Sequence, residues 1–253
     1  MKTALITLFL FACLVAENPP PIRHLTPPEK GFFSKRLDFH HLPVKAHQVV
    51  ADEALVADEA LVAGQARLEM MFAHMGRYRE TIMRKLEAAG VELHIIGRDQ
   101  VTTDLPEWRQ DKGKPLAEYN GQTRDERTRG MGGKLVSCGE ENLLKLPKDR
   151  YLGRDICVHE FAHCIRNFGI TPALRARFDK QHQSSLAKGL WTGSYAASNA
   201  DEFFAELSMW YFGTHGDLTM QGPKPKGGAE GLKEYDPEAY ALFDEFYGGR
   251  AKL

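Results

Sequence analysis

The feature that most constrains this chain is an H-E-x-x-H pattern at residues 159–163. It lies in an apolar run, residues 156–168, that contains no proline, so we expect an α-helix there. Residues four apart share one helix face, so His159 and His163 would aim two imidazoles at one point, as a zinc ion requires. Glu160 lies about 100° further round, where it can reach a water on that metal but is poorly placed as a ligand. The alternative is a structural helix with two partly buried histidines.

A catalytic zinc site usually has three protein ligands and leaves one position for water. The pattern with a third histidine requires glycine at 166 and histidine at 169, but the chain has Arg166 and Gly169, which excludes it. Asp217 follows a Gly-Thr pair, but its spacing is one residue away from that of sites with an aspartate ligand. His182 is favoured only by its proximity in the sequence. Both are weak candidates for the third ligand.

The strongest candidates for further metal-site residues are Glu202 and Glu206, four residues apart in an otherwise apolar helical stretch. Two acids on one face of a largely buried helix need a compensating charge, which a metal ion and its histidines would supply. The alternative is a solvated acidic face with an ordinary salt bridge.

The sequence H-E-F-A-H, followed by Y-x6-E-F-F-A-E, resembles the catalytic domain of anthrax lethal factor and the wider family of zinc peptidases built on it. The resemblance covers residues 130–212, about a third of the chain. It implies that Glu202 is the third zinc ligand and that Tyr195, seven residues earlier, assists catalysis. Residues 140–144 and 149–151 are similar to a pattern in secreted bacterial relatives. The toxin's large targeting and substrate-recognition regions have no counterpart in the sequence, so neither cell entry nor the toxin's substrate is implied.

These motifs together predict a secreted zinc-dependent endopeptidase that holds one zinc ion per chain through His159, His163 and Glu202. Glu160 would act as general base on the water and then pass the proton to the leaving amine. Tyr195 would hydrogen-bond the oxyanion of the tetrahedral intermediate. The alternative for Tyr195 is an ordinary half-buried tyrosine.

Further interactions around this site are also expected. Glu206 would orient a zinc-binding histidine, and a strand at residues 134–137 could pair with an extended substrate. Two other functions stay open: a secreted zinc-bound binding protein without turnover, and a zinc hydrolase of a non-peptide amide. The presence of Glu160 argues against the first, since binding alone needs no base.

The overall composition, with 43% hydrophobic and 26% charged residues among 253, is typical of a globular protein with a sizeable core. A net charge of −1 gives no support for a nucleic-acid partner. The expected partner is therefore a protein or peptide substrate, and the oligomeric state is left open.

Residues 1–16 are typical of a secretory signal, with an apolar stretch at 4–15 and a cleavage site after Ala16. No later stretch approaches the ~20 apolar residues of a membrane span, so we expect a secreted or periplasmic protein without stable membrane insertion. The alternatives are an uncleaved anchor and a lipoprotein acylated at Cys13. Residues 17–31 are rich in proline and are expected to form an extended, mobile N-terminus.

Three cysteines, Cys138, Cys157 and Cys164, remain after removal of the signal. Cys157 and Cys164 are two helical turns apart, roughly 10 Å, and cannot bridge each other. Either could pair with Cys138 in an oxidising compartment, or all three are buried thiols.

The remaining patterns predict one α+β domain, residues 32–253, with a small mixed sheet and a helix-rich C-terminal half. For this domain the resemblance implies a zincin-like metallopeptidase fold. His94 lies in a strand and is expected to be a core residue rather than a ligand. Asp149 or Asp155 would cap the helix that carries the histidines. Residues 98–133 are expected to form a long loop that ends in a glycine-rich tight turn. The expected helices are residues 51–75, 77–89, 156–168, 172–188, 199–212 and 237–247, and the expected strands are residues 45–50, 91–96, 134–137 and 142–146.

Overall fold

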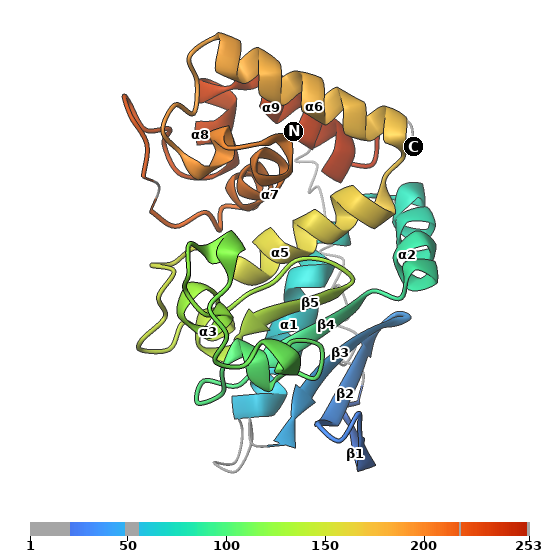
Figure 1. Ribbon diagram of the computed structural model, residues 1–253. Coiled ribbons are helices and arrows are strands. Elements are labelled where there is room, and N and C mark those ends of the chain that lie inside the picture. The colour runs from blue at the N-terminus through green and yellow to red at the C-terminus, as the bar shows by residue number, and fades with distance from the viewer. Residues whose placement is uncertain (1–20, 49–55, 218, 252–253) are drawn as a thin grey trace, which may run out of the picture.

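The computed structural model describes residues 21–48, 56–217 and 219–251, and Figure 1 shows how their helices and strands are arranged. The fold is α+β, as predicted, with five strands in one small mixed sheet of order β1-β2-β3-β4-β5. β1 to β3 pair antiparallel, whereas β3 to β5 pair parallel. The strands are β1 (Arg23–Glu29), β2 (Phe33–Phe39), β3 (Leu42–His47), β4 (Glu92–Ile96) and β5 (Leu135–Gly139).

Two helices, α1 (Val56–Phe72) and α2 (Arg77–Ala89), connect the parallel strands β3 and β4. A long crossover is required here because neighbouring parallel strands cannot be joined by a tight turn. α1 lies against β2, β3 and β4 and also contacts α5. α2 has the predicted bounds because Gly90 ends it with a left-handed φ of 74°.

The C-terminal half consists of helices, as predicted. α5 (Ile156–Cys164) continues into a π-helical turn (Ile165–Gly169), and α6 (Pro172–Ala187), α7 (Ala200–Tyr211), α8 (Gly228–Tyr235) and α9 (Pro237–Tyr247) follow. Figure 1 shows α5 crossing the middle of the molecule, between the sheet and the group of helices that contains α6, α7 and α9. α5 packs against β5 on the sheet side and against α7 on the helical side.

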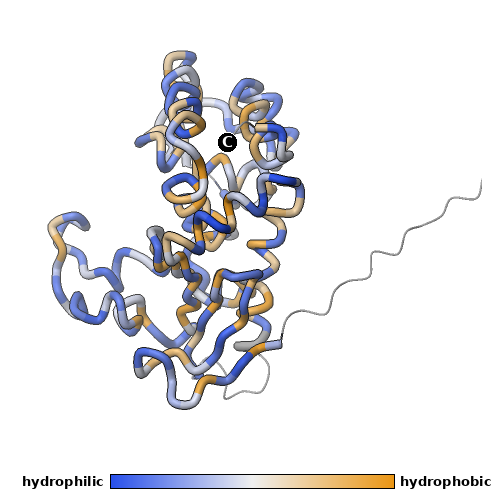
Figure 2. Tube along the Cα trace, turned by 90° about the vertical axis from the view of Figure 1, so that its right-hand side faces the viewer, coloured by the Kyte–Doolittle hydropathy of each residue, from blue (hydrophilic) through white to orange (hydrophobic). Residues whose placement is uncertain are grey.

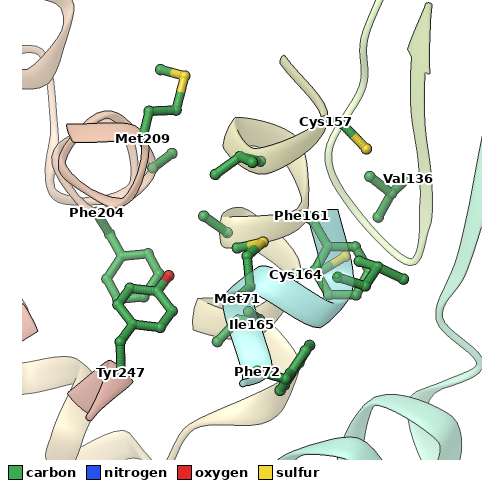
Figure 3. Close-up of a cluster of buried hydrophobic side chains, with 14 of the residues drawn as sticks. Met71, Phe72, Val136, Cys157, Phe161, Cys164, Ile165, Phe204, Met209 and Tyr247 are labelled. Carbon is green, nitrogen blue, oxygen red and sulfur yellow. The ribbon is translucent and has the colours of Figure 1, made fainter. Parts of the chain in front are cut away.

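One hydrophobic core joins the two halves, so the described residues pack as a single domain. The rings of Phe161 in α5 and Phe72 in α1 lie 6.2 Å apart between centroids, and Phe204 in α7 lies 6.5 Å from Tyr247 in α9. Figure 3 shows these two pairs on opposite sides of α5. Figure 2 shows hydrophobic and hydrophilic residues alternating over short distances along the chain, as expected for elements with one buried face.

The prediction of a strand at residues 142–146 is wrong. The four-residue helix α4 (Glu140–Leu143) and a turn occupy this segment. Its leucines suggest a strand, but the side chain of Asn142 donates to the carbonyl of Arg154 (2.7 Å) and accepts from the N–H of Ile156 (2.8 Å). These two bonds tie the turn to the start of α5.

The expectation of a mobile segment at residues 17–31 is also wrong for residues 23–29, because β1 pairs with β2 at one edge of the sheet. Pro27 and Pro28 are compatible with this strand, since an edge strand has one side where no N–H is needed. The pairing register shifts between His24 and Glu29. The neighbouring strand β2 was not predicted, and β3 overlaps residues 45–47 of the strand predicted at 45–50, of which residues 49–50 lie outside the described ranges.

The predicted loop at 98–133 is irregular but well connected. It contains short 3₁₀ turns and the four-residue helix α3 (Arg124–Arg127). Arg124 is buried, with its guanidinium 4.0 Å from the ring centre of Trp108 and 2.7 Å from a carboxylate oxygen of Asp111. These contacts explain how a polar segment of this length keeps a defined course.

Several predictions concern residues beyond the described ranges. The signal at 1–16, with Cys13 and Ala16, lies outside them, as do residues 51–55 of the predicted helix at 51–75. Among the residues that the structure describes, no helix is both long and apolar enough to cross a bilayer. Cys138, Cys157 and Cys164 are buried free thiols, which agrees with one of the two alternatives considered for them.

Candidate metal centre

The start of α5 is set by Asp155, one of the two predicted caps. Its Oδ1 accepts a hydrogen bond from the N–H of Val158 (3.1 Å), and its Oδ2 pairs with Arg67. The other candidate, Asp149, instead accepts from the side chain of Asn142 (3.1 Å). The cap satisfies a backbone donor that has no partner within the helix, and it fixes where the helix carrying the H-E-x-x-H pattern begins.

The ligand atoms of three predicted residues converge on one point. Nε2 of His159 lies 3.3 Å from Nε2 of His163. Oε2 of Glu202 lies 3.2 Å from the first nitrogen and 3.4 Å from the second. Three ligands about 2.0–2.2 Å from one tetrahedral ion would lie roughly 3.3–3.6 Å from one another. The triangle therefore has the dimensions of a tetrahedral metal site.

Glu202 reaches the histidines because α7 begins just before it and packs across α5. Asn199 caps α7 by accepting a hydrogen bond from the N–H of Glu202 (2.9 Å). Although Oε2 of Glu202 is buried close to both imidazoles, it makes no aligned hydrogen bond within the described part of the chain. Burial would raise the pKa of Glu202, but the two facing imidazoles outweigh it and hold that pKa far below its usual range.

Glu206 lies one turn further along α7 and approaches His159 from its other side. The Glu206 side chain is 2% exposed, and its Oε1 is 3.1 Å from Nδ1 of His159. Burial alone would lower the pKa of His159, but Glu202 and Glu206 outweigh it and raise this pKa to about 10. Glu206 is thus placed where it can orient the imidazole and leave Nε2 directed at the triangle.

Glu160 lies next to the same histidines. His159, Glu160 and His163 can each offer one ligand atom such that the three atoms lie within 4.8 Å of one another, so this group could hold a metal ion. Glu202 is nevertheless the better third ligand, because Glu160 directly follows His159 and points about 100° round the helix. Burial raises the pKa of Glu160 above its ordinary value, which makes it a stronger base.

The glycine-rich segment at 130–133 forms a wall of the site. A Cβ at Gly132 would lie 3.1 Å from Oε2 of Glu160 and 3.3 Å from Cβ of His163. A Cβ at Gly130 would lie 2.3 Å from Cγ2 of Ile156. The prediction of a tight turn therefore missed the main constraint on these glycines, which is the close passage of the backbone along α5.

Tyr195 lies at the edge of the site, in a 3₁₀ turn (Tyr195–Ala197) that precedes α7. It is 45% exposed, and its ring stacks on that of His159 with 6.2 Å between centroids. Partial burial and the negative charge of Glu202 raise the pKa of Tyr195 to about 12. Its hydroxyl therefore keeps its proton at neutral pH and can act as a hydrogen-bond donor.

A cavity of about 360 Å³ lies in front of these side chains and is lined by His159, Glu160, His163, Tyr195 and Glu202. The weaker candidates for the third ligand lie elsewhere. Asp217 is exposed and pairs with Lys224 at 3.2 Å. His182 is buried against Phe203, with 5.2 Å between ring centroids.

The sequence suggested that a strand at residues 134–137 could pair with a substrate, but the outer edge of β5 is already partly occupied. A strand is present, but the N–H and C=O of Ser137 already bond to Met131, at 2.9 and 3.0 Å. The expectation that residues 134–137 offer a free edge is therefore wrong at Ser137. The backbone of Gly132, which follows Met131, makes no hydrogen bond to any described residue.

The segments at 140–144 and 149–151 anchor the loop before α5. Glu141 accepts two hydrogen bonds from the guanidinium of Arg129, at 2.8 and 2.6 Å, while Asn142 bonds to Asp149. The same loop carries Arg154, which donates to the carboxylate of Glu206. Sequence reasoning missed Arg154, because no spacing rule connects an arginine in a loop with an acid about fifty residues later.

No family model matches the chain, and no curated protein is found to be similar to it.

Proposed function

We propose that the chain is a secreted or periplasmic zinc-dependent endopeptidase similar to the lethal-factor family. The observation that carries this proposal is the triangle of ligand atoms from His159, His163 and Glu202, with edges of 3.2 to 3.4 Å, beside Glu160 and a cavity. The proposed localisation depends on the signal sequence at residues 1–16.

The donor set favours zinc, with one ion per chain. Two imidazole nitrogens and one carboxylate oxygen are a common set of three protein ligands for catalytic zinc, whereas calcium and magnesium prefer oxygen ligands alone. The same donors can hold iron, but a glutamate directly after the first histidine is the arrangement of a hydrolytic site. When bound, zinc would polarise the scissile carbonyl and lower the pKa of a water molecule toward ~7.

Glu160 would move the protons. Its carboxylate takes a proton from the attacking water and delivers it to the nitrogen of the leaving amine. Its raised pKa suits both steps, because the group must accept a proton and release it within one cycle. Gly132 leaves room for this carboxylate, since a Cβ there would lie only 3.1 Å from its Oε2.

Tyr195 would stabilise the charge that develops on the substrate. Its hydroxyl keeps its proton at neutral pH and lies on the wall of the cavity, so it can donate to the oxygen of the scissile carbonyl as that oxygen becomes negative. Glu206 would hold His159 through Nδ1, which keeps the imidazole in one orientation throughout the cycle.

An extended peptide could be held by backbone pairing on the wall of the cavity. Ser137 is occupied by Met131, but the backbone of Gly132 makes no hydrogen bond to a described residue, and its Cβ position lies 3.1 Å from Oε2 of Glu160. Pairing of this kind recognises the peptide backbone, which favours a peptide over a small amide as the substrate.

The test is cleavage of an unbiased peptide library by the purified chain, with and without a chelator and beside a panel of small amides. We expect cleavage at defined peptide bonds that stops with chelator and returns with added zinc. Cleavage of small amides alone would favour the non-peptide hydrolase, and zinc binding without any turnover would favour the binding protein. Peptide cleavage that persists in chelator would contradict the proposed mechanism.

A further inference from the structure

We propose that Arg154 is a positioning residue for the metal centre, and that it holds Glu206 in the place from which Glu206 orients His159. This inference rests on the proposed zinc site. Nη2 of Arg154 donates to Oε1 of Glu206, and the same oxygen lies 3.1 Å from Nδ1 of His159. A single carboxylate oxygen thus faces two donors, one from the loop before α5 and one from the metal-site helix itself.

Arg154 supplies a charge that the buried carboxylate needs. The side chain of Glu206 is 2% exposed, whereas that of Arg154 is 25% exposed, so the arginine links a buried acid to the solvent side of the site. A carboxylate this deeply buried is costly unless it is paired and hydrogen-bonded. A partner on Oε1 also limits rotation of the carboxylate, and with it the orientation of the imidazole.

The backbone around Arg154 is tightly held, so the guanidinium has a fixed origin. The carbonyl of Arg154 accepts from Asn142 at 2.7 Å, and its N–H donates to the carbonyl of Tyr151 at 3.1 Å. On the far side, a Cβ at Gly216 would lie only 2.4 Å from the nitrogen of Arg154, so the two backbones are in close contact. These contacts give Arg154 the rigid support that an orienting residue requires.

Arg154 and Arg129 differ in what their guanidinium groups contact. Arg129 uses its donors on Glu141 and on the backbone carbonyls of Gly97 and Gln100, which is how an arginine cross-links loops. Arg154 makes its side-chain bond to Glu206, and its buried Nε has no hydrogen-bond partner in the described part of the chain. Arg154 also lines both the candidate metal-site cavity and a second cavity of about 290 Å³, which Tyr195 and Glu206 line as well. Its contacts therefore point to the site rather than to the surrounding loops.

The test is the zinc dissociation constant of R154Q and R154K, measured by competition with a chelator, together with the melting temperature of each metal-free protein. Loss of a residue that contacts a metal ligand from outside typically weakens metal binding about 10- to 100-fold. Arg154 acts one contact further out, through Glu206, so for R154Q we expect the lower end of this range, about 10-fold. R154K keeps the charge and can still donate to Glu206, so it should recover part of the loss.

The matched control is R166Q. Arg166 is 4% exposed and pairs with Asp179 at 2.6 Å and with Asp201 at 2.7 Å, so its loss removes an even more buried cation close to α5. Because Arg166 does not bond to Glu206, R166Q should lower the melting temperature while changing the zinc dissociation constant by less than about threefold, well below the effect expected for R154Q.

Zinc binding by R154Q as tight as in the wild type would overturn the inference, and so would an equal loss in R154Q and R166Q. If R154Q does not fold, R154K is the deciding variant. Weaker zinc binding than in the wild type, with an unchanged melting temperature of the metal-free protein, supports the inference. Unchanged zinc binding overturns it. A wild-type chain that binds no zinc would instead refute the proposed function, so the two failures are distinguishable.

Discussion

Two regions of the described structure place a buried histidine between two carboxylates, but only one of them adds a second imidazole. In the sheet, Nδ1 of His94 lies 2.5 Å from Glu107 and Nε2 lies 2.9 Å from Glu92. In the metal centre, the corresponding distances of His159 are 3.1 Å to Glu206 and 3.2 Å to Glu202. The two imidazoles therefore have similar nearest partners.

The surroundings of the two histidines differ in what faces Nε2. Glu92, on the Nε2 side of His94, also accepts from the ammonium of Lys45 at 2.8 Å, so a cation already completes this cluster. Glu202, on the Nε2 side of His159, instead faces a second imidazole, that of His163, and a cavity. The His94 cluster is therefore an ion-pair network. The His159 cluster is a candidate metal site because it contains a second imidazole. His94 is a core residue, as predicted.

The largest effect should come from removing the Glu202 carboxylate, which faces both imidazoles. We expect Glu202→Gln to lose its zinc and with it all peptidase activity, because a neutral amide is a poor substitute for a carboxylate ligand. Asp217→Asn, at an exposed residue, is the matched control and should retain one zinc per chain. Metal analysis of both purified variants is the measurement. Loss of zinc from the Asp217 variant only would show that the third ligand is misassigned.

The next largest effect should come from Glu160, which has no counterpart in the sheet cluster. Glu160→Gln should keep zinc and fold but lose about 10²- to 10⁴-fold in kcat, because it removes the base and leaves the ligands in place. Steady-state kinetics on one good peptide, with zinc content measured in parallel, tests this. Normal turnover would remove Glu160 from the mechanism.

Tyr195, stacked on His159, should give a smaller loss. Tyr195→Phe removes one hydroxyl and little packing, so we expect a loss of roughly 10²- to 10³-fold that appears mainly in kcat. The melting temperature and zinc content should barely change. If the variant instead loses about 1 kcal/mol of stability and keeps a normal kcat, Tyr195 is a structural residue.

The sheet cluster should respond through stability alone. In the folded protein the pKa of His94 is raised, because Glu107 and Glu92 outweigh its burial, and the pKa of Glu92 is lowered to about 2. A raised histidine pKa contributes stability that is complete below the unfolded value of about 6.5 and is lost as pH rises through the folded value. The lowered Glu92 pKa contributes stability above about pH 4.5 that is lost as pH falls toward 2.

His94→Gln is the variant that isolates this pH dependence. At about pH 5.5 it should cost roughly 3–5 kcal/mol, since it leaves Glu107 without its cation and Glu92 with Lys45 alone, and the cost should shrink as pH rises. Urea unfolding of both proteins in saturating zinc across this range measures the difference. Peptidase activity per folded molecule should stay at the wild-type level. A cost that is constant with pH would mean that His94 is neutral in the folded protein.

The elements that carry the site could be predicted from local patterns. The H-E-x-x-H spacing and the glutamates at i and i+4 both reflect helical periodicity, so α5 and α7 were found together with the side chains that they present. The strand predicted at 142–146 is absent because Asn142 ties a short helix and turn to distant backbone groups, which the pattern of leucines does not reveal. The roles of Gly132 and Arg154 could not be predicted from the sequence for a related reason: they depend on contacts between segments far apart in the chain.

The most direct test of the central claim is zinc-edge anomalous diffraction from crystals of the wild-type chain grown with zinc. We expect one strong peak per chain at about 2.0–2.2 Å from Nε2 of His159, from Nε2 of His163 and from a carboxylate oxygen of Glu202. A peak bound by other residues, a peak that excludes Glu202, or no peak at this triangle would contradict the account.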